Sequence, residues 1–178
     1  MRDSGDMSLD PFDIRILAAL QANARLSNVE LSKQVHLSAS QVQRRLQRLV
    51  ADGYVSAYTA VLDRDRIGLG VLAFTNVSLE RHGGTVVTGF DQAVRDMPEI
   101  LECYAVTGEH DYLLRIVAPD LHTFSEFLMH RLMTLPGVRS VRSSVVLQEI
   151  KHTTTFPLAH LARDRHERAA PRPRPSAG

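Results

Sequence analysis

The sequence predicts an α+β protein in which a helical N-terminal domain precedes a domain of mixed helices and strands. Helix-start signals recur three times within the first fifty residues, and apolar segments in the order βαββαβ follow residue 70. We therefore expect a three-helix, winged helix-turn-helix domain and then a ferredoxin-like domain. The expected boundaries are 1–62 for the helix-turn-helix domain, 63–70 for a linker, 71–160 for the ferredoxin-like domain and 161–178 for a disordered, Pro/Arg-rich tail.

The three N-terminal helices are each predicted from a residue that caps a helix start. The first start combines an N-cap aspartate with a proline at the first helical position, and the other two are capping boxes. These starts are Asp10-Pro11, Ser27-Asn-Val-Glu30 and Ser38-Ala-Ser-Gln41. The third helix is expected to stop near Gly53, and "YVSAYTAVL" (54–62) is expected to form a wing or a connecting strand.

The corner between the second and third helices contains His36 where a glycine is the usual residue. Such a corner needs one residue at positive φ, which histidine tolerates better than most non-glycine residues. No second histidine, cysteine or acid cluster lies nearby in sequence. A conformational role therefore accounts for His36 better than a catalytic or metal-binding one.

The C-terminal domain is predicted from alternating strand and helix patterns. Its helices are each closed by a proline, at Pro98 and Pro136. The predicted strands are 71–79, 100–106, 111–118 and 138–150, and the predicted helices are 85–97 and 121–135. This order places both helices on one face of an antiparallel sheet.

Composition excludes several classes of protein. No apolar run approaches the roughly 20 residues of a membrane span, and the N-terminus lacks the apolar core of a signal peptide. The single cysteine, Cys103, excludes an intrachain disulfide and is expected in the core, while the histidines show no zinc spacing. We expect a cytoplasmic protein with no cofactor, no metal site and no membrane partner.

Positive charge is concentrated on the predicted third helix. Residues 31–50 carry Lys33, Arg44, Arg45 and Arg48 and no acid, although the whole chain has a net charge of only +1. Arg44 projects opposite the apolar face formed by Val42, Leu46, Leu49 and Val50. Arginine and glutamine side chains pair with base edges, and serine near a helix N-terminus suits phosphates. The candidate contacts with double-stranded DNA are Ser38, Ser40, Gln41, Arg44, Arg45, Gln47 and Arg48. A solvated polar helix face is the alternative, and Arg45, at the edge of the apolar stripe, suits a structural or phosphate contact.

One loop of the C-terminal domain suits a small ligand. In "TGEHDY" (107–112), Gly108 lets backbone amides approach a carboxylate, and Glu109 and Asp111 can receive an ammonium group. The loop could therefore bind both the carboxylate and the ammonium group of an α-amino acid. The alternative is a simple hairpin turn, since tight polar loops between strands are common.

Two stretches of the chain resemble a known family. "LDPFDIRILAALQANARLSNVELSKQVHLSASQVQRRLQRLVADGYVSAYTAVLD" is similar to the N-terminal domain of the leucine-responsive/asparagine (Lrp/AsnC) regulators, and "VTGEHDYLLRI", "LPGVRSV" and "KHTTTFPL" resemble their C-terminal domain. The resemblance implies a transcription regulator, not an enzyme, that senses an amino acid and forms homodimers assembling to octamers. It also implies effector contacts at Gly108, Glu109, His110 and Asp111, and at Thr153, Thr154 and Thr155.

Two departures from the family pattern bear on function. His36 stands where a glycine is usual, and Glu109-His110 replaces the more usual residues of the effector loop. Some similar proteins act as sirohaem decarboxylases, which is the enzymatic alternative. The basic third helix and the absence of an acid/base constellation favour the regulator.

Overall fold

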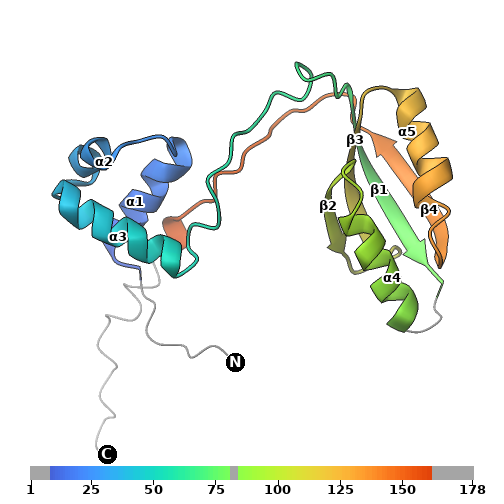
Figure 1. Cartoon of the computed structure of the whole chain (residues 1–178), viewed down its shortest axis with the longest axis horizontal. Coiled ribbons are helices and arrows are strands. Elements are labelled where there is room, and N and C mark those ends of the chain that lie inside the picture. The colour runs from blue at the N-terminus through green and yellow to red at the C-terminus, as the bar shows by residue number, and fades with distance from the viewer. Residues whose placement is uncertain (1–8, 81–83, 162–178) are drawn as a thin grey trace, which may run out of the picture. The chain divides into compact units, whose positions relative to one another are not determined.

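The computed structural model describes residues 9–80 and 84–161, which fall into two compact units (Figure 1). Of the described residues, the first unit comprises 9–60 and 152–161, and the second comprises 61–80 and 84–151. The tail predicted over 161–178 lies, from residue 162 onward, outside the described residues. In the part that the structure describes, no helix is long and apolar enough to cross a membrane.

The first unit contains the three predicted helices. Each begins at a side-chain cap, and in each case the residue three positions on bonds back to the cap, which completes a capping box. The helices are α1 (Pro11–Ala22), α2 (Asn28–Val35) and α3 (Ala39–Ala51). The three predicted helix starts are thereby confirmed.

The corner between α2 and α3 has the predicted conformation. His36 lies in the left-handed region with φ 57° and ψ 48°, and it is the one described non-glycine residue with positive φ. The next amide, Leu37 N–H, donates to the carbonyl oxygen of Ser32 at 3.1 Å. His36 therefore ends α2 with the left-handed conformation that a glycine usually adopts at this position.

The helical core lies where the three helices meet. Ile16, Leu31, Val42 and Leu49 are fully buried, whereas Val50, predicted on the same face, is 43% exposed. Val50 follows Leu49 directly, and one residue rotates the side chain by about 100° around a helix. That rotation carries Val50 out of the contact.

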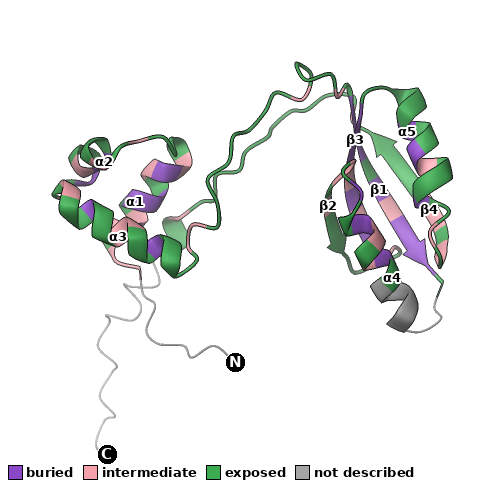
Figure 2. Ribbon diagram, viewed as in Figure 1, coloured by how far each residue is buried: buried purple, intermediate pink, exposed green. Residues whose placement is uncertain are grey.

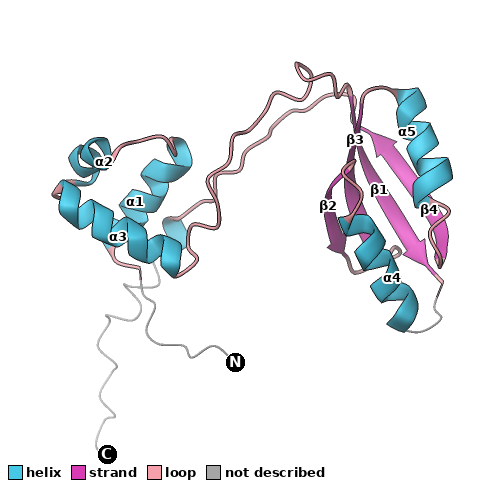
Figure 3. Cartoon of the chain, in the orientation of Figure 1, coloured by secondary structure: helices cyan, strands magenta, loops and turns pink. Residues whose placement is uncertain are grey.

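The predicted wing or connecting strand at 54–62 was wrong. These residues form no strand, and Tyr58, Val61 and Leu62 are all more than half exposed (Figure 3). A β-rich segment becomes a strand only when a second strand satisfies its backbone groups. None of the described strands pairs with this segment.

The second unit has the predicted ferredoxin-like order. Its elements are β1 (Val71–Leu79), α4 (Gly84–Arg95), β2 (Ile100–Ala105), β3 (Tyr112–Ala118), α5 (Leu121–Phe127), a π-helical turn η1 (Leu128–Leu132) and β4 (Val138–Val145). The strands are antiparallel in the order β2-β3-β1-β4. The helix predicted over 121–135 is thus α-helical for two turns and then π-helical, and the last strand ends at Val145 rather than at residue 150 because its ladder with β1 ends there.

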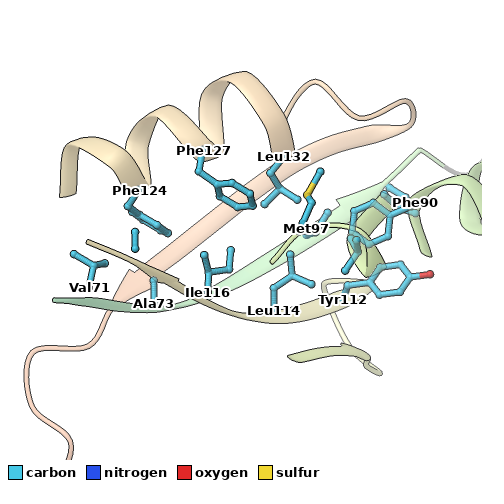
Figure 4. Packing of buried hydrophobic residues seen from close by; sticks show 14 residues of the cluster. Val71, Ala73, Phe90, Met97, Tyr112, Leu114, Ile116, Phe124, Phe127 and Leu132 are labelled. Carbon is cyan, nitrogen blue, oxygen red and sulfur yellow. The ribbon is translucent and has the colours of Figure 1, made fainter. Parts of the chain in front are cut away.

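Both helices cover the same face of this sheet, and the core lies between them (Figures 1 and 4). Figure 4 shows Phe124, Phe127 and Leu132 above Ala73 and Ile116 of the sheet. The opposite face carries none of the helices that the structure describes. Phe74 and Tyr104 lie on that face and are 40% and 54% exposed (Figure 2 shows the burial).

The segment from His152 onward belongs to the helical unit. Gln21 of α1 holds Phe156 through two hydrogen bonds: the amide nitrogen Nε2 donates to the Phe156 carbonyl at 3.2 Å, and Oε1 accepts from the Phe156 N–H at 2.7 Å. Leu158 packs against the helical core. The expected range 71–160 therefore differs from the structure at its end, because nothing within 152–160 signals a contact more than 130 residues away.

Candidate nucleic-acid interface and effector loop

The polar residues of α3 lie outside the helical core, as the sequence predicts. Val42 and Leu49 of α3 are fully buried, and Arg45 is only partly exposed. The remaining candidates are exposed: Ser38, Ser40, Gln41, Arg44, Gln47 and Arg48. Polar side chains therefore surround the N-terminal half of α3 on its solvent side.

The start of α3 is a closed network of short polar side chains. Ser38 Oγ accepts from the Gln41 N–H at 3.3 Å, and Gln41 Oε1 accepts from the Ser38 N–H at 3.0 Å. The hydroxyls of Ser38 and Ser40 lie 3.1 Å apart. These bonds fix the end of α3 that a helix-turn-helix protein directs toward base edges.

Arg44 differs from the other two arginines of α3. It is exposed and makes no hydrogen bond or ion pair with any of the described residues. Its five N–H donors are therefore available for a carboxylate, a phosphate or a guanine edge.

Arg45 and Arg48 are ion-paired with the start of α1. Arg45 Nη1 lies 2.6 Å from Asp10 Oδ2 and 2.8 Å from Asp13 Oδ1, and Arg48 Nη2 lies 2.5 Å from Asp13 Oδ2. The Asp13 side chain is only 1% exposed. Burial acts to raise the pKa of Asp10, but hydrogen bonds from the Asp13 and Phe12 amides and from Arg45 outweigh it and lower that pKa.

Sequence reasoning missed Asp13. It lies on the side of α1 that also buries Ile16, Leu17 and Leu20. An acid at helical spacing from apolar residues was the available signal, because a buried carboxylate requires a cation. The sequence alone does not say which cation supplies the charge.

The predicted effector loop connects β2 to β3 and is anchored to β1. Asp111 Oδ2 accepts from the Leu79 N–H at 2.8 Å, and the Asp111 N–H donates to the Val77 carbonyl at 3.0 Å. His110 Nδ1 lies 3.1 Å from the hydroxyl of buried Ser78. Asp111 thus has a structural contact that the sequence did not predict.

The rest of this loop is open. Gly108 has φ 119°, a conformation that favours glycine, and no atom lies within 4 Å of a Cβ built there. Glu109 is exposed and lies 3.4 Å from Arg142 of β4. The loop therefore presents the exposed residues Glu109 and Asp111, with the guanidinium of Arg142 beside Glu109.

Thr153, Thr154 and Thr155 belong to a different unit from this loop. All three are exposed, and the Thr155 N–H donates to Thr153 Oγ1 at 3.1 Å. Within neither unit does the structure bring them together with Gly108 to Asp111.

A cleft of about 490 Å³ lies between α4 and β2. At its wall the hydroxyl of Tyr112 donates to Asp91 Oδ1 at 2.8 Å, and burial together with this bond raises the pKa of Tyr112 to about 12. Cys103 lines the cleft and is exposed, so its expected core position was wrong. Burial and then the negative charge of Asp91 raise the pKa of the Cys103 thiol, which disfavours the reactive thiolate. Among the described residues, no group of three or more histidine, cysteine or acidic side chains is arranged to hold a metal ion.

Comparisons with known proteins cover both units. Residues 9–56 match the winged helix-turn-helix DNA-binding family, and residues 72–156 match the Lrp/AsnC ligand binding domain. The leucine-responsive regulatory protein of Escherichia coli is 39% identical over 145 residues, which are 82% of this chain and 88% of that protein.

Solved structures show the same likeness. A transcriptional regulator from Neisseria meningitidis, in complex with L-methionine, is 46% identical with a TM-score of 0.84, covering 86% of this chain and 99% of its own. An AsnC family regulator from Agrobacterium tumefaciens is 32% identical with a TM-score of 0.81, covering 85% of this chain and 99% of its own.

A helix-turn-helix unit joined to a ligand-binding α+β unit defines a DNA-binding transcription regulator. The identities and coverage then fix the family. This chain belongs to the Lrp/AsnC regulators.

Proposed function

We propose that this regulator contacts DNA through the exposed side of α3, with Arg44 as its central contact. The observation that carries the proposal is that Arg44 is exposed and has no partner among the described residues, on a helix whose other side is fully buried. Ser38, Ser40, Gln41 and Gln47 flank it on the same helix. Arg45 and Arg48, which the sequence also predicts as DNA contacts, are ion-paired with carboxylates, and we propose that they contribute little to this interface.

Substitution of Arg44 by alanine tests the interface. Arg44→Ala should leave the melting temperature nearly unchanged, because the side chain is exposed and makes no hydrogen bond or ion pair with the described residues. Binding to the DNA upstream of the protein's own gene should weaken, by about 1–3 kcal/mol if the contact is to a base edge. A phosphate contact would instead weaken binding to specific and random duplexes alike. Unchanged binding to both duplexes would remove Arg44 from the interface.

We further propose that the effector is an α-amino acid bound at the β2–β3 loop. The structurally similar Neisseria regulator was solved with L-methionine, which supports this class of ligand. A carboxylate suits the amides near Gly108, and an ammonium group suits Asp111. Glu109 and His110 flank that position, and the hydroxyls of Thr153, Thr154 and Thr155 are proposed as additional contacts.

The structure changes how this site should be tested. Because Asp111 accepts a hydrogen bond from the Leu79 N–H, an alanine would loosen β1 as well as remove the charge. Asp111→Asn keeps an acceptor there and removes only the charge. We expect calorimetry with each of the twenty amino acids to give heat for at least one, and Asp111→Asn to abolish it. Arg139→Gln, a charge change at an exposed residue of β4, is the matched control. No heat from any amino acid, or a normal response of Asp111→Asn, would refute the assignment.

We propose that the helix-free face of the sheet forms a homodimer interface and that dimers assemble further, to octamers. Phe74 and Tyr104 on that face are 40% and 54% exposed, and an aromatic sheet face favours coverage by a second copy. Phe74→Asp should reduce the mass of the assembly measured by sedimentation. Leu121→Asp, at an exposed position of α5, should not. Equal masses for both variants would refute this face.

The proposed place of action is the cytoplasm. No observation on the described residues supports the sirohaem decarboxylase alternative, and the comparisons do not support it either.

A further inference from the structure

Two carboxylates at the start of α1 occupy both of the other arginines of the DNA-facing helix. All four carboxylate oxygens are used. Asp10 Oδ1 accepts from the amides of Phe12 and Asp13, and Asp10 Oδ2 accepts from Arg45. Asp13 Oδ1 accepts from Arg45, and Asp13 Oδ2 accepts from Arg48 and from the Asp10 amide.

Release of either arginine from this cluster would be costly. Arg45 is only 21% exposed in its side chain and bonds both carboxylates through one nitrogen, Nη1. Asp13 is 1% exposed, so the loss of its cations would leave a buried charge without a partner. Arg48 is 50% exposed and is held through Nη2 alone, so a phosphate that draws it away must break a contact of 2.5 Å with the buried Asp13 carboxylate.

The cluster also cancels charge. The region 31–50 carries four basic residues and no acid, yet two of the four face Asp10 and Asp13. Arg44 of α3 and Lys33 of α2 make no ion pair with the described residues. Two of the three positive charges of α3 are therefore offset by carboxylates, which weakens the electrostatic attraction to DNA that its sequence suggests.

We propose that Asp10 and Asp13 withhold Arg45 and Arg48 from the DNA backbone and thereby limit sequence-independent binding by this regulator. Asp10 and Asp13 are positioning residues that act through the two arginines. Specificity is the ratio of specific to non-specific affinity, so reduced phosphate contact raises it even as total affinity falls. The inference rests on the proposed role of α3 as the DNA-facing helix.

The salt dependence of binding measures phosphate contacts and separates this role from a purely structural one. The logarithm of the binding constant falls with the logarithm of salt concentration, with a slope of about −0.9 for each phosphate neutralised. Full-length protein is titrated onto a random 30-base-pair duplex by fluorescence anisotropy between about 0.05 and 0.3 M NaCl.

Charge removal on each arginine gives the first pair of results. Arg44→Gln should make the slope shallower by about 0.9 for each subunit that contacts DNA. Arg48→Gln should leave the slope unchanged. An equal loss in the two variants would overturn the proposal, and no loss in Arg44→Gln would instead refute α3 as the DNA-facing helix.

Neutralisation of the acids gives the second pair of results. Asp13→Asn should steepen the slope by about 0.9 and tighten random-duplex binding about eightfold at 0.1 M salt for each arginine released. The Asp10 side chain is more exposed than that of Asp13, and an asparagine there keeps an oxygen that can cap α1. Asp10→Asn therefore provides the same test if Asp13→Asn does not fold. Asp10→Asn should show the same change in smaller degree, because Asp13 still holds both arginines.

Asp52→Asn is the matched control, because it removes an equal charge at the other end of α3 from a side chain with no ion pair among the described residues. An unchanged slope in folded Asp13→Asn or Asp10→Asn would overturn the proposal. An equal change in Asp52→Asn would also overturn it, since net charge alone would then explain the effect.

Discussion

Replacement of His36 by glycine measures how much strain the corner between α2 and α3 stores. His36 has φ 57° and ψ 48° and is exposed, so its conformation is the main feature that the substitution changes. A left-handed conformation costs a non-glycine residue roughly 1–2 kcal/mol. Glycine removes that cost but loses roughly 0.5–1 kcal/mol more than other residues on folding. We expect His36→Gly to stabilise the helical unit by about 0 to 1.5 kcal/mol.

Calorimetry and amide exchange on the full chain check this value. For a unit of this size, 1 kcal/mol shifts the melting temperature by about 4–8 °C, so the expected rise is between zero and about 12 °C. Amide exchange at Leu37, whose N–H donates to the Ser32 carbonyl oxygen at 3.1 Å, should slow by up to about tenfold. Lys33→Gly, at an exposed position in the last turn of α2, should lower stability by about 1 kcal/mol, since it adds glycine entropy without relief of strain. A melting temperature many degrees lower in His36→Gly would refute the strain argument and show that the imidazole makes a stabilising contact.

Three further substitutions test packing and titration. Leu31→Ala, at a fully buried position of the helical core, should lower the free energy of unfolding by about 2–5 kcal/mol in urea denaturation. Folding lowers the pKa of Asp10, so the ionised carboxylate contributes stability above its ordinary pKa of 3.8, and this contribution is lost as pH falls through the lower pKa of the folded state. Asp10→Asn should therefore reduce the loss of unfolding free energy at acid pH. An unchanged loss would contradict this. Folding raises the pKa of Tyr112 from 10 to about 12, so the neutral phenol contributes stability below pH 10 and this contribution is lost as pH rises toward 12. Tyr112→Phe, which has no phenol to ionise, should therefore lose a smaller fraction of its neutral-pH stability between pH 10 and 12 than the unsubstituted protein. Equal fractional losses would contradict this.

The helix starts were predictable because their interactions are local. The capping boxes Ser27–Glu30 and Ser38–Gln41 join residues three positions apart, so the sequence pattern names both partners. The same holds for the left-handed corner at His36, where the choice of conformation depends on two adjacent helix ends. The βαββαβ order was predictable from apolar periodicity and from the prolines that close each helix.

The ion pairs that the arginines of α3 form were not predictable in this way. The sequence distinguished Arg44, opposite the apolar face, from Arg45 at its edge. The ion pairs that Arg45 and Arg48 make, and that Arg44 does not make with any described residue, depend on residues 32 to 35 positions away. The hydrogen bond that the Asp111 carboxylate accepts from the Leu79 N–H likewise joins residues 32 positions apart.

The sequence by itself determined the helix and strand order, the two classes of domain and the family, because these follow from local propensity, apolar period and motif. Only the tertiary structure decided which charges are neutralised, where β4 ends and that residues 152–161 pack on the helical unit. The physical reason is that ion pairing, ladder pairing and packing each require two segments to meet. The sequence of one segment does not specify its partner in another.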